Sequence, residues 1–392
     1  MSNIKTFEKP VGFHDLLPDT TAKKRIIENQ LQALFDRWGY REMMTPTLEY
    51  EETVGKVSKI TSEKLFKLLD RMGQTLVLRP DMTAPIARVV SSILKNQNWP
   101  IRLSYHSNVF RAQAIEGGRA AEFFQSGIEL VGEGTPDADV EVLALAVEAL
   151  KLLKVGDFSL IVGHTGYLDG ILEDIIEDGS FRDKLKTFLA DKNFVGYREE
   201  VLALTQSDEE KNILLSVLKM QGDITELETA LTRTKSERAK KVLTDLIEVW
   251  NLLKIYQAEE YITFDLTMVP HLEYYTGLVF EGTVANLGFP ICGGGRYDSL
   301  LDAFDNPQQA IGFALKINRI LDIAAIMSDE KDIIKVIYDN KHQKEALGYA
   351  ADLRKESNAI VETYQIEGKD KSSIAFDENA EIVWLIEEET EK

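Results

Sequence analysis

Polar side chains that could bind a ligand recur at three places along the 392-residue chain. In the segment AEFFQSGIELVG, Phe123, Gln125, Gly127 and Glu129 are spaced by two residues and share one face if the segment is a strand. A buried polar group without a partner costs about 1 to 3 kcal/mol, so a glutamine and a glutamate suit an apolar core poorly. This face is therefore either solvated or part of the lining of a polar cavity.

The second place is the segment LVLRPDMTAPIARVV, which predicts a short strand at residues 76–78, a turn at Pro80 and then a helix. Asp81 and Thr83 lie at this turn. A carboxylate and a hydroxyl can be held there near a ligand rather than in the core.

The third place is the aromatic and glycine-rich stretch of residues 264–298. It predicts adjacent antiparallel strands, with the hydroxyls of Tyr274 and Tyr275 facing a pocket floored by the bare backbone of glycines 293–295. The alternative is an ordinary glycine-rich hairpin with tyrosines in its core. Cys292, beside the glycines, is interpreted as a small buried side chain rather than a nucleophile.

The pattern of apolar residues predicts the elements that hold these side chains. Helical spacing indicates an amphipathic helix over residues 21–38, closed by Gly39 and followed by a strand-like run. A hydroxyl N-cap and an early proline indicate a second helix over residues 135–153. The other predicted elements are a strand, loop and strand over 101–132, a strand over 158–163, and a helix over 311–326 that carries Lys316 and Arg319.

Two changes in the pattern divide the chain. Charged, helix-favouring segments replace the strand signals between about residues 168 and 257, and strands resume at Tyr261. We therefore predict a helical insertion, its charges on a solvated surface, inside an antiparallel sheet domain of residues 1–326. Residues 331–392 predict a small β-α-β unit with one further strand, so the fold class is α+β with a small C-terminal α/β domain.

Composition narrows the function classes. The formal net charge of -20 provides no basic footprint for nucleic acid. No apolar run approaches the roughly 20 residues that span a bilayer, and the polar N-terminus lacks the pattern of a signal peptide, which predicts a cytoplasmic protein. The single cysteine excludes an intrachain disulfide and a cysteine-cluster metal site.

Six ordered blocks carry a family resemblance: LRPDMTA, VFRAQ, FFQSGIELVG, LEYYTGLVFE, GGGRYD and GFALKINRI. Over about residues 8 to 326, the chain resembles the catalytic domain of histidyl-tRNA synthetases. The resemblance implies a class II aminoacyl-tRNA synthetase fold, an antiparallel sheet flanked by helices. It also implies that residues 331–392 are a truncated counterpart of the anticodon-binding domain.

By the same resemblance, the polar residues form a pocket for histidine. A carboxylate suits the ligand's α-ammonium group, while a second carboxylate and a tyrosine hydroxyl can bracket the imidazole nitrogens. One family glutamate is shortened to an aspartate in this chain. The implied histidine-binding residues are Asp81, Thr83, Arg111, Gln125, Glu129, Tyr274, Tyr275 and Tyr297.

The chain departs from the synthetases where adenylate chemistry occurs. Pro270 replaces the arginine that stabilises charge during adenylate formation, and it cannot donate a hydrogen bond. In the third motif, Lys316 and Asn318 replace a glycine and a glutamate. We therefore assign no catalytic or metal-binding residues and predict a vestigial nucleotide site made of Arg111, Gln113, Arg119 and Arg319.

A chain that keeps the histidine pocket but lacks the catalytic residues resembles the family of ATP phosphoribosyltransferase regulatory subunits. That resemblance implies a dimer, formed through the first helix and strand, that joins a short-form catalytic subunit in a hetero-oligomer for the first step of histidine biosynthesis. Histidine is then an effector rather than a cofactor, and tRNA is not expected as a partner. The alternatives are a histidyl-tRNA synthetase or related histidine-activating enzyme, and a scaffold with a vestigial pocket.

Overall fold

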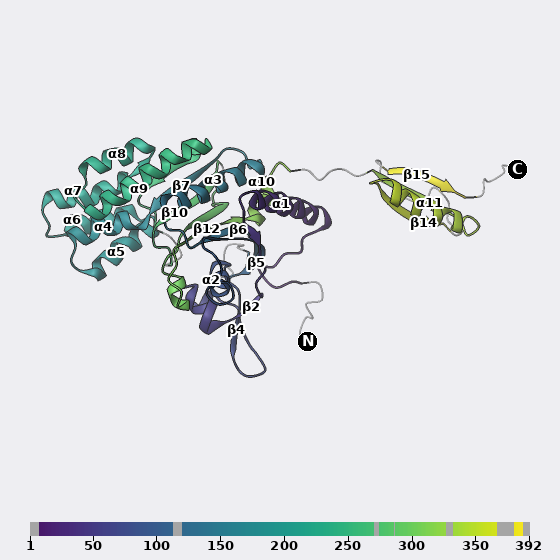
Figure 1. Ribbon diagram of the computed structural model, residues 1–392, viewed down its shortest axis with the longest axis horizontal. Coiled ribbons are helices and arrows are strands. Elements are labelled where there is room, and N and C mark those ends of the chain that lie inside the picture. Colours follow the sequence, from purple (N-terminus) through teal and green to yellow (C-terminus); the bar gives the residue numbers. More distant parts are fainter. Residues whose placement is uncertain are drawn as a thin grey trace. The chain divides into compact units, whose positions relative to one another are not determined.

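The computed structural model describes residues 8–112, 120–269, 274–285, 287–326, 332–366 and 380–386. The chain forms two compact units, Met1–Ile326 and Met327–Lys392 (Figure 1). The first unit holds all the residues of the predicted ligand site.

A nine-stranded sheet of described residues is the centre of the first unit. The six strands from β5 to β7 in its middle pair antiparallel, while β1 pairs with β5, and β9 with β7, in parallel. The strands, in their order across the sheet, are β1 (Arg41–Glu42), β5 (Ile101–Phe110), β6 (Glu122–Val131), β12 (Ala310–Lys316), β11 (Cys292–Arg296), β10 (Leu278–Val284), β7 (Phe158–His164), β9 (Ile262–Asp265) and β8 (Gln221–Gly222).

Helices α1 (Pro18–Arg37), α3 (Pro136–Leu152) and α10 (Ile317–Ile323) cover one face of this sheet (Figure 1). Their apolar side chains share a core with Ile128 of β6 and Phe313 of β12. Gly39 ends α1 with φ +82°, a left-handed conformation that glycine adopts without steric cost. Pro136 lies in the first turn of α3, where its missing N–H costs no helical hydrogen bond.

A group of helices enters the chain between β7 and β9. Because β7 and β9 are adjacent parallel strands, with Leu160 opposite Ile262, the two ends of the insertion lie side by side. Figure 1 shows the helices gathered at one end of the unit beside β7. They are α4 (Thr165–Ile175), α5 (Gly179–Ala190), α6 (Phe194–Ala203), α7 (Asp208–Ser216), α8 (Ile224–Arg233) and α9 (Glu237–Leu253), with the two-residue strand β8 between α7 and α8.

A second, three-stranded sheet has the order β2-β4-β3. It consists of β2 (Leu48–Tyr50), β4 (Thr75–Leu78) and β3 (Lys67–Leu69), and α2 (Thr83–Ser92) follows β4 directly. The strand-like run predicted after the first helix is thus split between two sheets, with β1 in the large sheet and β2 in the small one. The turn between β4 and α2 holds Asp81, and Thr83 is the first residue of α2, at the end of the predicted turn.

The predicted helix over residues 311–326 is wrong in its first third. Residues up to Lys316 belong to strand β12, and α10 is a short helix that begins at Ile317. β12 lies between β6 and β11 and is apolar on both faces, so its residues form a continuous apolar run. Periodicity does not distinguish such a strand from a buried helix.

The predicted α+β class, with an antiparallel sheet flanked by helices, is confirmed. The second unit contains β13 (Ile333–Tyr338), α11 (Gln343–Glu356), β14 (Ile360–Gln365) and β15 (Ala380–Leu385). Its strands pair in parallel in the order β14-β13-β15 around Val336, with Ala346 and Ala350 of α11 packed on them.

Candidate functional site

The candidate site occupies the face of the central sheet that carries Gln125, Gly127 and Glu129, which we call the site face. Gln125 and Glu129 are buried, so the solvated alternative for this face is excluded. Helix α2 packs over it through an apolar cluster that includes Ile86, Leu103 and Tyr297.

Small residues leave the backbone of the site face bare beside these polar groups. The register places Gly312 of β12 opposite Glu129, and a Cβ at Gly312 would lie 2.0 Å from Glu129 Oε2. Glycines 293–295 lie within strand β11 rather than in a turn. Above Gly293 the nearest atom to a Cβ would be a backbone oxygen 3.9 Å away.

Glu129 lies at the deep end of the site and is 2% exposed. Thr83 Oγ1 donates a hydrogen bond of 2.9 Å to its Oε1, and the Tyr297 hydroxyl donates one of 2.5 Å to its Oε2. Burial raises the pKa of Glu129 to about 8, and the two hydrogen bonds only partly oppose that rise. At neutral pH, burial therefore favours the protonated form of Glu129.

Asp81 provides an acceptor beside Glu129. Its Oδ1 accepts a hydrogen bond of 2.9 Å from the backbone N–H of Ala84 in the first turn of α2. Its Oδ2 is buried and has no hydrogen-bond partner among the described residues. Burial raises the pKa of Asp81, opposed by the Ala84 N–H and by the charge of Arg111. The free oxygen is thus placed to accept a hydrogen bond from a ligand.

Arg111 follows the last residue of β5, next to Asp81. Its Nε donates a hydrogen bond of 3.0 Å to the Pro80 carbonyl oxygen, and its guanidinium carbon lies 5.6 Å from the centre of the Phe123 ring. These two contacts hold the guanidinium group beside the turn that carries Asp81.

Three predicted tyrosines form an aromatic wall. The ring centre of Tyr274 lies 4.9 Å from that of Tyr275 and 6.2 Å from that of Tyr297. Tyr274 and Tyr297 are each 2% exposed, and burial raises the pKa of all three phenols. The hydroxyls therefore stay protonated and act as hydrogen-bond donors.

Sequence reasoning missed Tyr105, a buried residue of β5 on the site face. It lies opposite Gly127, where a Cβ would be 2.5 Å from the Tyr105 hydroxyl oxygen. Only the register between β5 and β6 brings the two residues together, and a shift of one residue would turn Tyr105 to the other face.

The predicted nucleotide site is described only in part. Gln113 and Arg119 lie outside the described residues, as does Pro270. Arg319 donates a hydrogen bond to the Pro290 carbonyl oxygen, and its guanidinium carbon lies 5.0 Å from the Phe289 ring centre. Asn318 accepts a hydrogen bond of 2.6 Å from the backbone N–H of Phe124.

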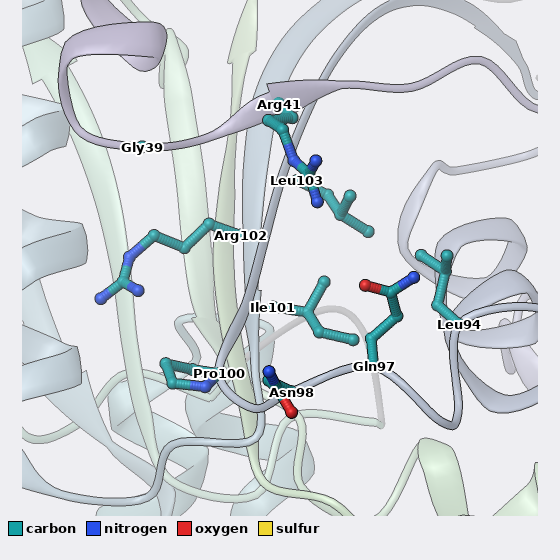
Figure 2. Close-up of a pocket in the computed structure, with 9 residues that line it drawn as sticks. All are labelled: Gly39, Arg41, Leu94, Gln97, Asn98, Pro100, Ile101, Arg102 and Leu103. Carbon is teal, nitrogen blue, oxygen red and sulfur yellow. The ribbon is translucent and has the colours of Figure 1, made fainter.

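A separate pocket lies at the edge of the sheet that β1 forms, beside the start of β5 (Figure 2). Ile101, Leu94 and Gln97 point toward its centre in Figure 2, whereas Arg102 points away. Arg102 instead pairs with Glu141 of α3 at 2.7 Å. No predicted ligand-binding residue lines this pocket.

The described residues contain neither a cluster of metal ligands nor a thiol with a lowered pKa. Within these residues, no three histidine, cysteine or acidic side chains are grouped as metal ligands. Cys292 is buried in β11, and burial raises the pKa of its thiol to about 12.

None of the described helices has the length and apolar character needed to cross a bilayer.

Comparison with known proteins first identifies the class. Residues 12–320 match the family model described as Histidyl-tRNA synthetase, which agrees with the sheet and the site described above.

Individual relatives then narrow the family. A Halalkalibacterium halodurans protein named ATP phosphoribosyltransferase regulatory subunit is 45% identical over 92% of this chain and 91% of its own length. A Bacillus subtilis protein of the same name is 44% identical over 91% of each chain. A crystal structure described as an ATP phosphoribosyltransferase regulatory subunit/histidyl-tRNA synthetase from Bacillus halodurans has a TM-score of 0.91 and 41% identity, covering 99% of this chain and 100% of that one. The chain belongs to the ATP phosphoribosyltransferase regulatory subunit family.

Proposed function

We propose that this chain is a non-catalytic regulatory subunit that binds histidine on the site face and conveys its presence to a short-form catalytic subunit. The complex would convert ATP and phosphoribosyl pyrophosphate to phosphoribosyl-ATP. One observation carries the proposal: buried Glu129 is bracketed by Thr83 and Tyr297, next to the unpartnered carboxylate oxygen of Asp81.

Histidine suits these groups chemically. Its α-ammonium can donate to Asp81 Oδ2, which has no other partner among the described residues. At neutral pH, the imidazole and Glu129 share one acidic proton in addition to the N–H of the neutral imidazole, because Glu129 has a pKa of about 8 and free imidazole titrates near 6.5. That proton gives one strong hydrogen bond whichever partner carries it.

The surroundings of the third motif support a role without catalysis. Asn318, which stands where synthetases have a glutamate, binds the backbone N–H of Phe124. The guanidinium group of Arg319 is occupied by the Pro290 carbonyl oxygen and lies against Phe289. Pro270 supplies no charge in place of the synthetase arginine. Asn318 and Arg319 thus bind the protein's own backbone, which leaves little provision for stabilising a transferring phosphate.

Feedback requires a coupling between two sites. Histidine must bind one state of the assembly more tightly than the other, and each tenfold difference in affinity corresponds to about 1.4 kcal/mol. Thr83, which contacts Glu129, is the first residue of α2, and the short turn before it leads directly back to β4 of the small sheet. We propose that this connection carries the histidine signal toward the surface of that sheet.

Self-association through the first helix and the strands after it also belongs to the proposal. Met44 is 79% exposed, and Leu48 and Tyr50 of β2 are 42% and 49% exposed. An apolar surface of this kind suits contact with a second copy of the chain. Light scattering should give the mass of a dimer for the wild type and of a monomer for Leu48→Glu with Tyr50→Glu.

The decisive experiment is reconstitution. The chain is mixed with a purified short-form catalytic subunit, and phosphoribosyl-ATP formation is measured with and without histidine. We expect activity only with both subunits and inhibition by histidine that weakens in Glu129→Gln. Activity of the catalytic subunit alone, unchanged by this chain, would refute the regulatory role.

Two further measurements address the alternatives. Histidine-dependent exchange of pyrophosphate into ATP by this chain alone would identify a histidine-activating enzyme. Calorimetry that finds no histidine binding, while the chain still activates the catalytic subunit, would identify a scaffold with a vestigial pocket.

A further inference from the structure

Lys316 is a cation of the site face without an ion pair among the described residues. It is the last residue of β12, lies opposite Gln125 of β6 and is half-buried. The charged and titratable groups around it come from four elements: Arg111 after β5, Glu281 of β10, Cys292 of β11 and Arg319 of α10.

A bound anion would offset the positive charge at the Lys316 end of the site. Burial and the nearby charges of Arg319 and Arg111 lower the pKa of Lys316 to about 8, with Glu281 opposing them. Half-buried cations that repel each other are stabilised by a bound negative group. The glycine backbone of β11 beside Lys316 leaves room, because no atom lies within 3.9 Å of a Cβ placed at Gly293.

The spacing along the strands suits the length of an amino acid. Glu129 lies opposite Gly312, and Gln125 lies opposite Lys316, so the two levels are about 13 Å apart at roughly 3.3 Å per residue. The four-carbon stem of a lysine can cover roughly 6 Å of this distance. Arg111 lies near both ends of the proposed ligand. Its Nε donates a hydrogen bond to the Pro80 carbonyl oxygen, next to Asp81, and its guanidinium carbon lies 5.6 Å from the ring centre of Phe123, two residues before Gln125 on β6.

We infer that Lys316, with Arg111, forms the subsite for the α-carboxylate of the ligand, so that the site selects a zwitterionic amino acid over the corresponding amine. The inference rests on the proposed histidine site and adds the group that distinguishes histidine from histamine. Asp81 takes the ammonium group, Lys316 and Arg111 take the carboxylate, and Glu129 takes the ring.

Calorimetry on the full chain tests this, with L-histidine and histamine as the two ligands. We expect the wild type to prefer histidine. Lys316→Met should lose about 10- to 100-fold in histidine affinity and less than threefold in histamine affinity, because only histidine has the carboxylate. Lys316→Arg should keep the preference. Lys219→Met, which removes an exposed lysine charge elsewhere, should bind as the wild type does.

The other possible outcomes distinguish failure of the carboxylate subsite from failure of the proposed histidine site. If the wild type binds histidine and Lys316→Met binds it equally well, or loses both ligands to the same extent, the carboxylate subsite is wrong and the proposed function stands. If the substitution abolishes binding of AMP but not of histidine, the anion is a phosphate, and the inference is likewise overturned. If the wild type binds neither histidine nor histamine, the proposed histidine site itself fails.

Discussion

Replacing Glu129 by glutamine tests the central physical claim about the site, its buried protonated carboxyl. The folded protein holds this proton up to a pH of about 8, whereas the unfolded chain releases it near the ordinary value of 4.5. The folded state therefore binds more protons between these pH values, and the wild type loses stability as the pH rises from about 4.5 to 8. Above that range the loss is complete and constant.

The magnitude follows from the two pKa values. Each unit corresponds to about 1.36 kcal/mol, so Glu129 alone makes the wild type up to about 5 kcal/mol less stable at pH 9 than at pH 4. Glutamine has the shape of the protonated side chain and does not titrate. Glu129→Gln should therefore match the wild type within about 1 to 2 kcal/mol at pH 5. At pH 9 it should exceed the wild type by several kcal/mol.

Urea unfolding of both proteins at one-unit steps from pH 5 to 9 measures this difference. Asp139, whose pKa is raised to about 7 by burial, adds its own slope to both curves, so only the difference between the two proteins is diagnostic. Glu52→Gln serves as the control because it removes an exposed carboxylate. A difference between wild type and Glu129→Gln that stays constant over this pH range would refute the protonated, buried state of Glu129.

Two further predictions concern other buried groups. Arg296→Met should destabilise the protein by about 3 to 5 kcal/mol in urea unfolding, because it removes the cation 2.7 Å from the buried Asp139 carboxylate. Adding Asp139→Asn should restore only part of the loss, because Arg296 also donates hydrogen bonds to the carbonyl oxygens of Glu133 and Thr135; no recovery at all would contradict the pairing. Gly312→Ala should abolish histidine binding in calorimetry, because its methyl group would meet Glu129 Oε2 at 2.0 Å. The control Gly348→Ala, whose methyl group meets no atom within 4 Å, should bind histidine as the wild type does. Unimpaired binding by Gly312→Ala would contradict the requirement for a bare backbone on the site face.

Local patterns in the sequence predicted the parts of the site that lie on one element. The spacing of two residues placed Gln125 and Glu129 on one strand face, and the turn after Pro80 placed Asp81 and Thr83 together. The contacts that shape the site join residues far apart in the chain: Glu129 accepts hydrogen bonds from Thr83, 46 residues away, and Tyr297, 168 residues away. Periodicity within one segment contains no information about such pairings.

The strand β12 shows a second limit of sequence reasoning. Its apolar residues match a buried helix as well as a buried strand, and only its neighbours β6 and β11 decide between them. The same misassignment placed Lys316 on a helix. In the structure Lys316 ends a strand and belongs to the site face, opposite Gln125.

The long sequence separation between Glu129 and Tyr297 also affects when the site can form during synthesis of the chain. During synthesis at roughly 5 to 20 residues per second, the 168 residues between them take roughly 10 to 30 seconds to emerge from the ribosome. The β5-β6 hairpin is local and can form early, but its edge stays open until the inserted helices and then β12 have been made. Until then, Glu129 can remain in water as an ordinary carboxylate. Its protonated, ligand-ready form therefore belongs only to a chain that has completed its sheet.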